Sequence, residues 1–175
     1  MVRCVTGGLC VIIMRLDRID HAILDHLQRD GRATSGELGE VAGLSPSPAH
    51  RRQRLLEEGG IIRGYVALLD QDRVGLPVTV FVSVRLSAQT EEHLAAFEST
   101  IAEVPEVMEC YVMSGASDYL LRVVAPDLNA FEEFLRTKLT RIPGVRGVES
   151  AFALKRVTYR TSLPLPNHVL RRGKG

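Results

Sequence analysis

Three arginines, Arg51, Arg52 and Arg54, stand close together between residues 46 and 56, where the chain has no acidic residue. Their guanidinium groups could pair with phosphates or with guanine edges in the major groove of DNA. The wider segment, residues 16–65, has seven arginines and eight acidic residues, so its positive charge is local. A local basic face is what contact with a single groove requires.

A helix over residues 46–58 would present these arginines on its exposed face. Ser45 is a favourable N-cap, and Pro46 suits the first helical position, where its missing N–H costs nothing. Ala49 and Leu56 would face inward. We expect the DNA contacts to come from Ser45, Ser47, Pro48, His50, Arg51, Arg52 and Arg54.

The preceding elements complete a helix-turn-helix. Residues 35–42 predict a helix that Gly43 ends, because glycine accepts the left-handed conformation of a helix C-cap. A first helix is expected from Asp17 to Arg29, and residues 61–65 predict a wing hairpin. The alternative is an ordinary helical hairpin whose arginines form a solvated face. The inward side chains would be Ile19, Ile23, Leu24, Leu27, Leu38, Val41 and Ala42.

The second half of the chain repeats one plan twice. Strands are predicted at residues 78–86, 107–113, 119–125 and 148–157. Thr90 and Asp127 are expected to cap the two intervening helices. Two β-α-β units in tandem predict a ferredoxin-like βαββαβ sandwich with both helices on one face of an antiparallel sheet. The inward helical residues would be Leu94, Phe97, Ile101 and Val104 in the first helix, and Leu128, Phe131, Leu135, Leu139 and Ile142 after Asp127.

The uncovered sheet face must find a partner, so we expect a homodimer through sheet faces or edges. Apolar groups on the two sides of the sheet would come from Phe81, Met108, Val112, Leu120 and Phe152. The predicted fold class is therefore α+β, an N-terminal winged helix-turn-helix followed by a ferredoxin-like βαββαβ regulatory domain.

Composition limits the other possibilities. The chain has 175 residues, a formal net charge of +1 and 45% hydrophobic residues, and its apolar segment at residues 7–14 is too short to span a membrane. We interpret residues 1–15 as a disordered leader, with Met14 as a hypothetical start of translation. The three cysteines match no zinc pattern and indicate a reducing cytoplasm, with Cys110 as a buried strand residue. No metal or cofactor is expected.

The expected domains are residues 16–65 for DNA binding, 66–77 as linker and 78–157 as the ferredoxin-like domain, to which the family resemblance described below assigns effector binding and oligomerisation. Residues 158–175 form a basic tail, since six basic residues and no acidic ones lie between residues 155 and 175. Such a composition is typical of a solvated, disordered tail. A sequence-independent arm that adds phosphate contacts is the functional alternative.

These motifs together resemble the Lrp/AsnC family of bacterial and archaeal regulators, over residues 16–157. They are the first-helix start at residues 16–20, the 43–48 turn with Arg51 and Arg52, and the segment at residues 114–121. The resemblance implies dimers that assemble to tetramers or octamers, and an amino acid or related small molecule as effector. Gln53 departs from the family, which usually has an inward aliphatic residue there. Ala116 also departs, because many relatives have a polar or acidic residue at this position.

The resemblance places the effector at the turn formed by Gly115, Ala116, Ser117, Asp118 and Tyr119. Backbone N–H groups of a glycine-containing turn suit a carboxylate, and Asp118 could balance an α-ammonium group. Asp118 could instead bond its own backbone as a turn residue.

Three functions compete. The leading one is a transcriptional regulator whose DNA binding changes with effector. The second is an architectural DNA-compacting protein without an effector, which the basic tail favours. The third, a decarboxylase, lacks the paired catalytic groups that such chemistry needs, so we expect no enzymatic activity.

Overall fold

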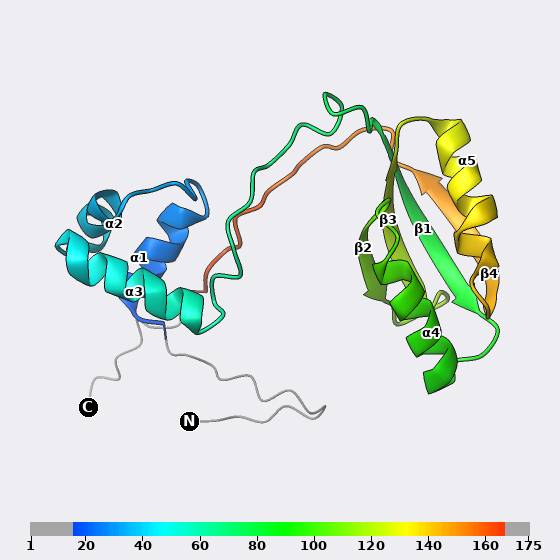
Figure 1. Ribbon diagram of the computed structural model, residues 1–175, viewed down its shortest axis with the longest axis horizontal. Coiled ribbons are helices and arrows are strands. Elements are labelled where there is room, and N and C mark those ends of the chain that lie inside the picture. Colours follow the sequence, from blue (N-terminus) through cyan, green and yellow to red (C-terminus); the bar gives the residue numbers. More distant parts are fainter. Residues whose placement is uncertain (1–15, 167–175) are drawn as a thin grey trace. The chain divides into compact units, whose positions relative to one another are not determined.

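The structure is a computed structural model that describes residues 16–166. It consists of two units, one made of residues up to 67 with those from 158 onward, and one made of residues 68–157 (Figure 1). The predicted leader at residues 1–15 and the end of the basic tail at residues 167–175 lie outside the described residues.

The first unit contains three helices, α1 (Arg18–Leu27), α2 (Ser35–Ala42) and α3 (Pro46–Glu58). The bounds of α2 and α3 are as predicted, whereas α1 ends two residues before Arg29. Gly43 ends α2 in the left-handed region with φ of 67°. The core is formed by Ile23, Leu24, Leu27, Leu38, Ala49 and Leu56.

Two predictions for this unit are wrong. Val41 is 45% exposed, because the buried face of α2 is formed by Leu38 and Gly39. Residues 59–77, all of which the structure describes, contain no strand, so the wing hairpin at residues 61–65 is absent. Ser45 occupies the N-cap position of α3 as predicted, although its side chain makes no capping hydrogen bond.

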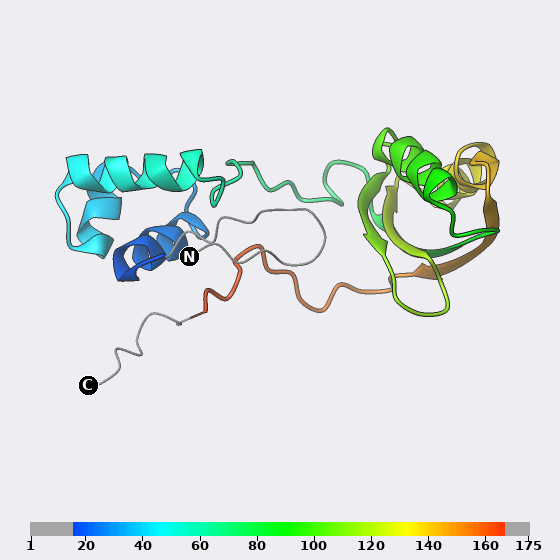
Figure 2. The same cartoon turned by 90° about the horizontal axis from the view of Figure 1, so that it is seen from below.

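The second unit begins with β1 (Val78–Leu86), α4 (Glu91–Ala102), β2 (Val107–Val112) and β3 (Tyr119–Ala125). It ends with α5 (Leu128–Thr137), a 3-10 turn η1 (Leu139–Arg141) and β4 (Val145–Phe152). The strands form one antiparallel sheet in the order β2-β3-β1-β4, which is the predicted ferredoxin-like arrangement. Both helices lie on the same face of this sheet (Figure 2).

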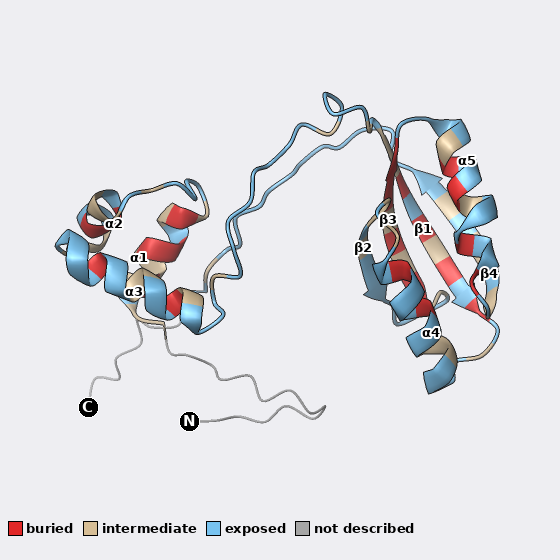
Figure 3. Cartoon of the chain, viewed as in Figure 1, coloured by how far each residue is buried: buried red, intermediate tan, exposed pale blue. Residues whose placement is uncertain are grey.

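The alternation of β1 places Val80, Val82 and Val84 in the core beneath the helices (Figure 3). Thr90 and Asp127 cap α4 and α5 as predicted. The prediction for α5 is wrong at Leu128, which is 60% exposed at the first helical position. Phe134, absent from the predicted stripe, is buried instead.

The last strand lies earlier in the sequence than predicted, because β4 covers Val145–Phe152 rather than 148–157. Phe152 pairs with Val80, and its ring meets Phe131 edge-on with centroids 5.4 Å apart. Phe152 therefore lies on the helix-covered face. Phe81 and Leu120, whose register positions alternate with the core residues, lie on the uncovered face.

Part of the predicted solvated tail is held against the first unit. The backbone N–H of Leu163 donates to Gln28 Oε1, and the Ser162 hydroxyl donates to the Gln28 carbonyl over 3.3 Å. Leu165 packs on the helical core. Residues 162–165 are thus bound to the end of α1, contrary to the expectation of a freely solvated segment.

Candidate nucleic-acid interface and effector site

The exposed face of α3 includes six of the seven residues that the sequence predicted to contact DNA. Ser45, Ser47, Pro48, His50, Arg51 and Arg54 are exposed. Arg54 Nη2 lies 2.9 Å from Glu58 Oε1, and this exposed ion pair leaves the guanidinium accessible. Arg51 has no acidic partner within residues 16–166. The N-terminal turns of α3 therefore present cationic and polar side chains together, beside backbone N–H groups that attract anions.

Arg52 belongs to a different part of the head. Its Nη1 lies 2.7 Å from Asp17 Oδ2 and 2.8 Å from Asp20 Oδ1, which ties α3 to the start of α1. The hydrogen bonds that Arg52 donates to Asp20 and Asp17 raise its pKa. Both aspartates neutralise this guanidinium, so Arg52 joins α3 to α1, and its contact with DNA stays a prediction.

Asp17 and Asp20, which pair with Arg52, also form the N-terminal cap of α1. Asp17 caps the helix by accepting from the N–H groups of Ile19 and Asp20, while Asp20 Oδ2 accepts from the Asp17 N–H. Burial alone would raise the pKa of Asp17, but the hydrogen bonds from Asp20 and Arg52 and the charge of Arg52 lower it. The Asp17 carboxylate is therefore ionised at neutral pH.

Gln53, the departure from the family pattern, neither packs inward as a hydrocarbon nor points at a phosphate. Its amide donates to Glu57 Oε1 over 3.1 Å and to the Tyr65 hydroxyl over 2.9 Å. Burial and the hydrogen bond to Glu57 raise the pKa of Tyr65. This polar network fastens the segment after α3, where a wing was expected.

The predicted effector turn connects β2 to β3, and Asp118 fastens it to β1. Asp118 Oδ2 accepts from the Leu86 backbone N–H over 2.7 Å, and Oδ1 accepts from the Gln89 side-chain amide. The Asp118 backbone N–H donates to the Val84 carbonyl over 2.9 Å. The alternative that Asp118 bonds its own backbone is wrong for the carboxylate, because its donors come from β1 and the segment after it rather than from the turn itself.

A cavity of about 460 Å³ lies beside this turn. It is lined by Arg85, Leu86, Gln89, Gly115, Ala116, Asp118, Arg146 and Gly147. Three of the five predicted effector residues are among them, and Ser117 is half-buried within the same turn. Arg85, Gln89 and Arg146 were missed. The period of β1 could have indicated Arg85, because its alternation points Arg85 away from the core.

Tyr119 does not belong to this cavity. It is buried at 1% exposure on the helix side of the sheet, where its hydroxyl donates to Glu98 Oε1 over 2.7 Å. Its ring packs on Phe97 with centroids 4.5 Å apart. Burial and the neighbouring Glu98 carboxylate raise the pKa of Tyr119 well above its usual range. The prediction that Tyr119 contacts effector at the turn is not supported by this placement.

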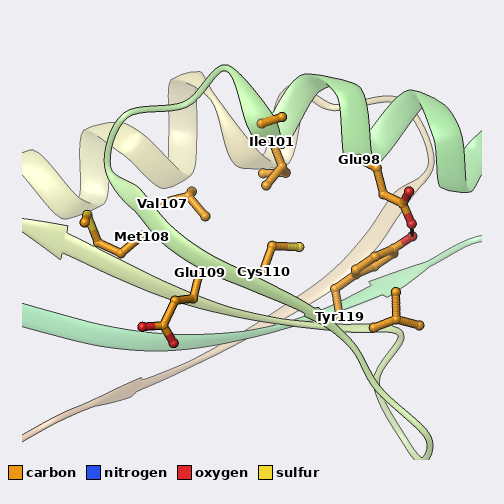
Figure 4. Close-up of a pocket in the computed structure, with 9 residues that line it drawn as sticks. Glu98, Ile101, Val107, Met108, Glu109, Cys110 and Tyr119 are labelled. Atoms are coloured by element: carbon orange, nitrogen blue, oxygen red, sulfur yellow. Dashed lines mark hydrogen bonds between the residues drawn. The ribbon is translucent and has the colours of Figure 1, made fainter. Parts of the chain in front are cut away.

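Tyr119 lines a second cavity of about 430 Å³ between α4 and β2, shown in Figure 4. Glu98 and Ile101 come from α4, while Val107 and Cys110 come from β2. Cys110 is exposed, so its prediction as a buried residue is wrong, because β2 is the edge strand of the sheet. The mixed apolar and acidic lining suits no carboxylate ligand.

Residues 16–166 contain no cluster of three or more His, Cys, Asp or Glu side chains that could hold a metal ion. No described helix is long and apolar enough to cross a bilayer. The described residues offer charged and polar groups at the face of α3 and at the cavity beside Asp118.

Comparison with known proteins agrees with this division. Residues 16–63 match a family model described as winged helix-turn-helix DNA-binding, and residues 79–163 match the Lrp/AsnC ligand binding domain. The Bkd operon transcriptional regulator of Pseudomonas aeruginosa is 51% identical, with 86% of this chain and 98% of that protein covered. The transcriptional activator DecR of Escherichia coli is 37% identical over 86% of this chain and 99% of its own.

Solved structures show the same relationship. A transcriptional regulator from Neisseria meningitidis in complex with L-Met superposes with a TM-score of 0.83 and 41% identity, covering 89% of this chain and 99% of that one. An AsnC family regulator from Agrobacterium tumefaciens gives a TM-score of 0.81 at 45% identity, covering 85% and 97%. The relatives named above are transcriptional regulators rather than enzymes. The chain belongs to the Lrp/AsnC family of DNA-binding transcriptional regulators.

Proposed function

We propose that this regulator binds specific DNA sequences through α3 and changes its DNA affinity or oligomeric state when an amino acid or related small molecule binds. The observation that supports DNA reading most directly is the exposed face of α3, where His50, Arg51 and Arg54 lie together without an uncompensated acidic residue. The rigid connection of α3 to α1 through Arg52 holds this face in place.

In the proposed complex α3 enters the major groove of double-stranded DNA. Arg51 is suited to a guanine edge, since its fork can donate two parallel hydrogen bonds to O6 and N7. Ser47 and His50 offer further donors and acceptors to neighbouring bases or phosphates. Contacts from Ser45, Pro48 and Arg54 would fix the register on the backbone.

The effector is proposed to bind at the cavity beside Gly115, Ala116 and Asp118. Support comes from the match of this half to a ligand binding domain and from the L-Met complex of the Neisseria meningitidis relative. A cavity of about 460 Å³ is within the range that holds small ligands. The turn is hydrogen-bonded to β1 through Asp118. A ligand that moves the turn would therefore also move the end of β1.

We further propose a cytoplasmic homodimer that assembles to a tetramer or octamer. Phe81 is 40% exposed on the uncovered sheet face, and the half-buried Leu120 lies on the same face. Two such faces would bury each other's apolar groups on association. Dimers would place two copies of α3 on successive turns of one side of a DNA duplex.

The proposal is tested by selecting DNA from a random duplex pool with the purified protein, followed by a thermal-shift screen of the twenty amino acids. A common motif among the selected duplexes and a ligand that raises the melting temperature are the expected results. Strong DNA retention without any motif, together with no stabilising ligand, would favour the architectural DNA-compacting function instead.

A further inference from the structure

We infer that Arg85 and Arg146 form an anion-binding site in the cavity beside Asp118, and that the effector is held there by its carboxylate rather than by an ammonium group. The inference rests on the proposed function only in taking this cavity as the effector site. It predicts that organic acids without an ammonium group, 2-oxo acids among them, bind at least as well as amino acids.

The charge of the cavity favours an anion. Arg85 and Arg146 both line it, and within residues 16–166 neither guanidinium pairs with an acidic side chain. The only acidic residue in the lining is Asp118. Two cations face one anion, so the lining has a formal charge of +1 before any ligand binds.

Asp118 is already engaged on both carboxylate oxygens. Oδ2 accepts from the Leu86 backbone N–H and Oδ1 accepts from the Gln89 amide. These bonds hold the carboxylate toward the end of β1. A ligand ammonium group that used Asp118 would have to compete with both donors while lying close to two guanidinium groups, and like charges repel at such range.

The backbone explains why both arginines reach one place. Arg85 of β1 stands opposite Gly147 of β4, and a Cβ placed on Gly147 would lie 3.7 Å from Arg85 Nε. The Arg85 side chain therefore lies in contact distance of Gly147 on β4. The register then shifts, because Leu86 pairs with Val145 and leaves Arg146 as the extra residue of a bulge. Bulges commonly redirect a side chain at a sheet edge.

The guanidinium group suits a carboxylate, because its planar fork donates two parallel hydrogen bonds to the two carboxylate oxygens. A 2-oxo acid offers a carboxylate and an adjacent carbonyl oxygen, which are acceptors for two guanidinium groups and place no positive charge near them. The Gln89 amide and the backbone of Gly115 and Ala116 line the rest of the polar wall.

The test is isothermal titration of the full chain with three matched probes, L-methionine, its 2-oxo acid 4-methylthio-2-oxobutanoate, and its amino alcohol L-methioninol. We expect the 2-oxo acid to bind at least as tightly as the amino acid, and the amino alcohol, which lacks the carboxylate, not to bind. Arg85→Gln and Arg146→Gln should each weaken binding of the 2-oxo acid by about tenfold or more. Arg136→Gln on α5, where Arg136 pairs with Glu132 over 3.6 Å, is the matched control and should bind as wild type.

The inference is wrong if L-methioninol binds as tightly as L-methionine, if both arginine variants keep wild-type affinity, or if none of the three probes binds. Arg85→Lys retains the charge without the fork, and an affinity between those of wild type and Arg85→Gln would support bidentate recognition if unfolding of Arg85→Gln obscures its result. DNA selection by Arg85→Gln separates the two proposals, because loss of ligand binding with retained motif selection leaves DNA reading intact.

Discussion

Arg52 Nη1 lies 2.8 Å from Asp20 Oδ1, and this contact joins α3 to α1 in the first unit. Asp20 is 7% exposed, so its charge is held away from water and depends on Arg52. The arrangement assigns the three arginines of α3 to different tasks. Arg52 holds the head together, while Arg51 and Arg54 remain on its surface.

Arg52→Ala should lower the free energy of unfolding of the head by about 1–3 kcal/mol, because it leaves the Asp20 carboxylate without its cationic partner. Urea denaturation followed by far-UV circular dichroism measures the change. Arg54→Ala, which breaks only an exposed pair with Glu58, is the control and should cost less than about 0.5 kcal/mol. Equal effects of the two substitutions would contradict the assignment of Arg52.

Arg51→Ala should leave stability unchanged and weaken DNA binding by about tenfold, since a bidentate base contact contributes about 1–3 kcal/mol. If Arg51 instead contacts a phosphate, Arg51→Ala should weaken binding equally for all DNA sequences. The slope of log K against log salt concentration should then become shallower by about one. Fluorescence anisotropy over a salt series distinguishes the two cases. Arg29→Ala, in the turn just after α1 and paired with Asp25, is the control that should change neither quantity.

Two glycines of α2 should respond oppositely to alanine. A Cβ on Gly39 would lie 2.6 Å from the Leu44 carbonyl oxygen, so Gly39→Ala must push the turn before α3 and should destabilise the head by about 1–3 kcal/mol. A Cβ on Gly36 meets Thr34 Oγ1 at an ordinary 3.7 Å, and Gly36→Ala should stabilise by up to about 1 kcal/mol. Thermal melts of both variants measure this difference, which a loosely packed turn would not produce.

Acid should weaken the second unit through Glu106. Burial raises the pKa of Glu106, but its hydrogen bond and ion pair with Lys138 outweigh this and leave the pKa below its usual value. A carboxyl pKa lowered on folding stabilises above the unfolded pKa, and that stability is lost as pH falls through the folded pKa. The contribution should be about 0.5–1 kcal/mol, since Lys138 is 41% exposed.

The measurement is urea denaturation between neutral pH and the acid range, with wild type and Lys138→Met. Removing the ammonium group takes away what lowers the pKa, so the variant should be less stable at neutral pH and should lose less stability on acidification. Parallel curves for the two proteins would exclude this pair as a source of the pH dependence.

Tyr119→Phe should leave effector affinity unchanged, because the Tyr119 hydroxyl bonds Glu98 on the helix side of the sheet. The cost should appear in stability, at about 0.5–1.5 kcal/mol for the lost hydrogen bond. Ligand titration beside denaturation checks both quantities. A loss of ligand affinity without loss of stability would return Tyr119 to the effector site.

Local signals predicted most of the fold. The caps at Asp17, Thr90 and Asp127 and the strict alternation of β1 placed helix starts and strand faces correctly, since each depends on a few adjacent residues. The prediction of a wing hairpin was wrong because of contacts with another element of the fold. Residues 61–65 have β-forming side chains, but Tyr65 bonds to Gln53 and Glu57 on α3, and no described strand pairs with them.

The site was less predictable because its partners are distant in sequence. Arg52 contacts Asp20, which lies 32 residues away in the sequence, and Asp118 contacts Leu86 at the same sequence separation. Arg146 joins Arg85 only because a register shift lies between β1 and β4. Spacing along a single helix or strand contains none of this information, so the sequence could indicate the turn and the helix but not the side chains that complete them.

We propose that α3 recognises specific DNA sequences through Arg51. The most direct measurement is the affinity of the purified protein for a duplex selected from a random pool, compared with a scrambled duplex of the same length and salt concentration. We predict a specificity ratio of about a thousandfold or more for wild type, and a ratio reduced by about tenfold for Arg51→Ala. Equal affinity of the wild-type protein for both duplexes would contradict the account.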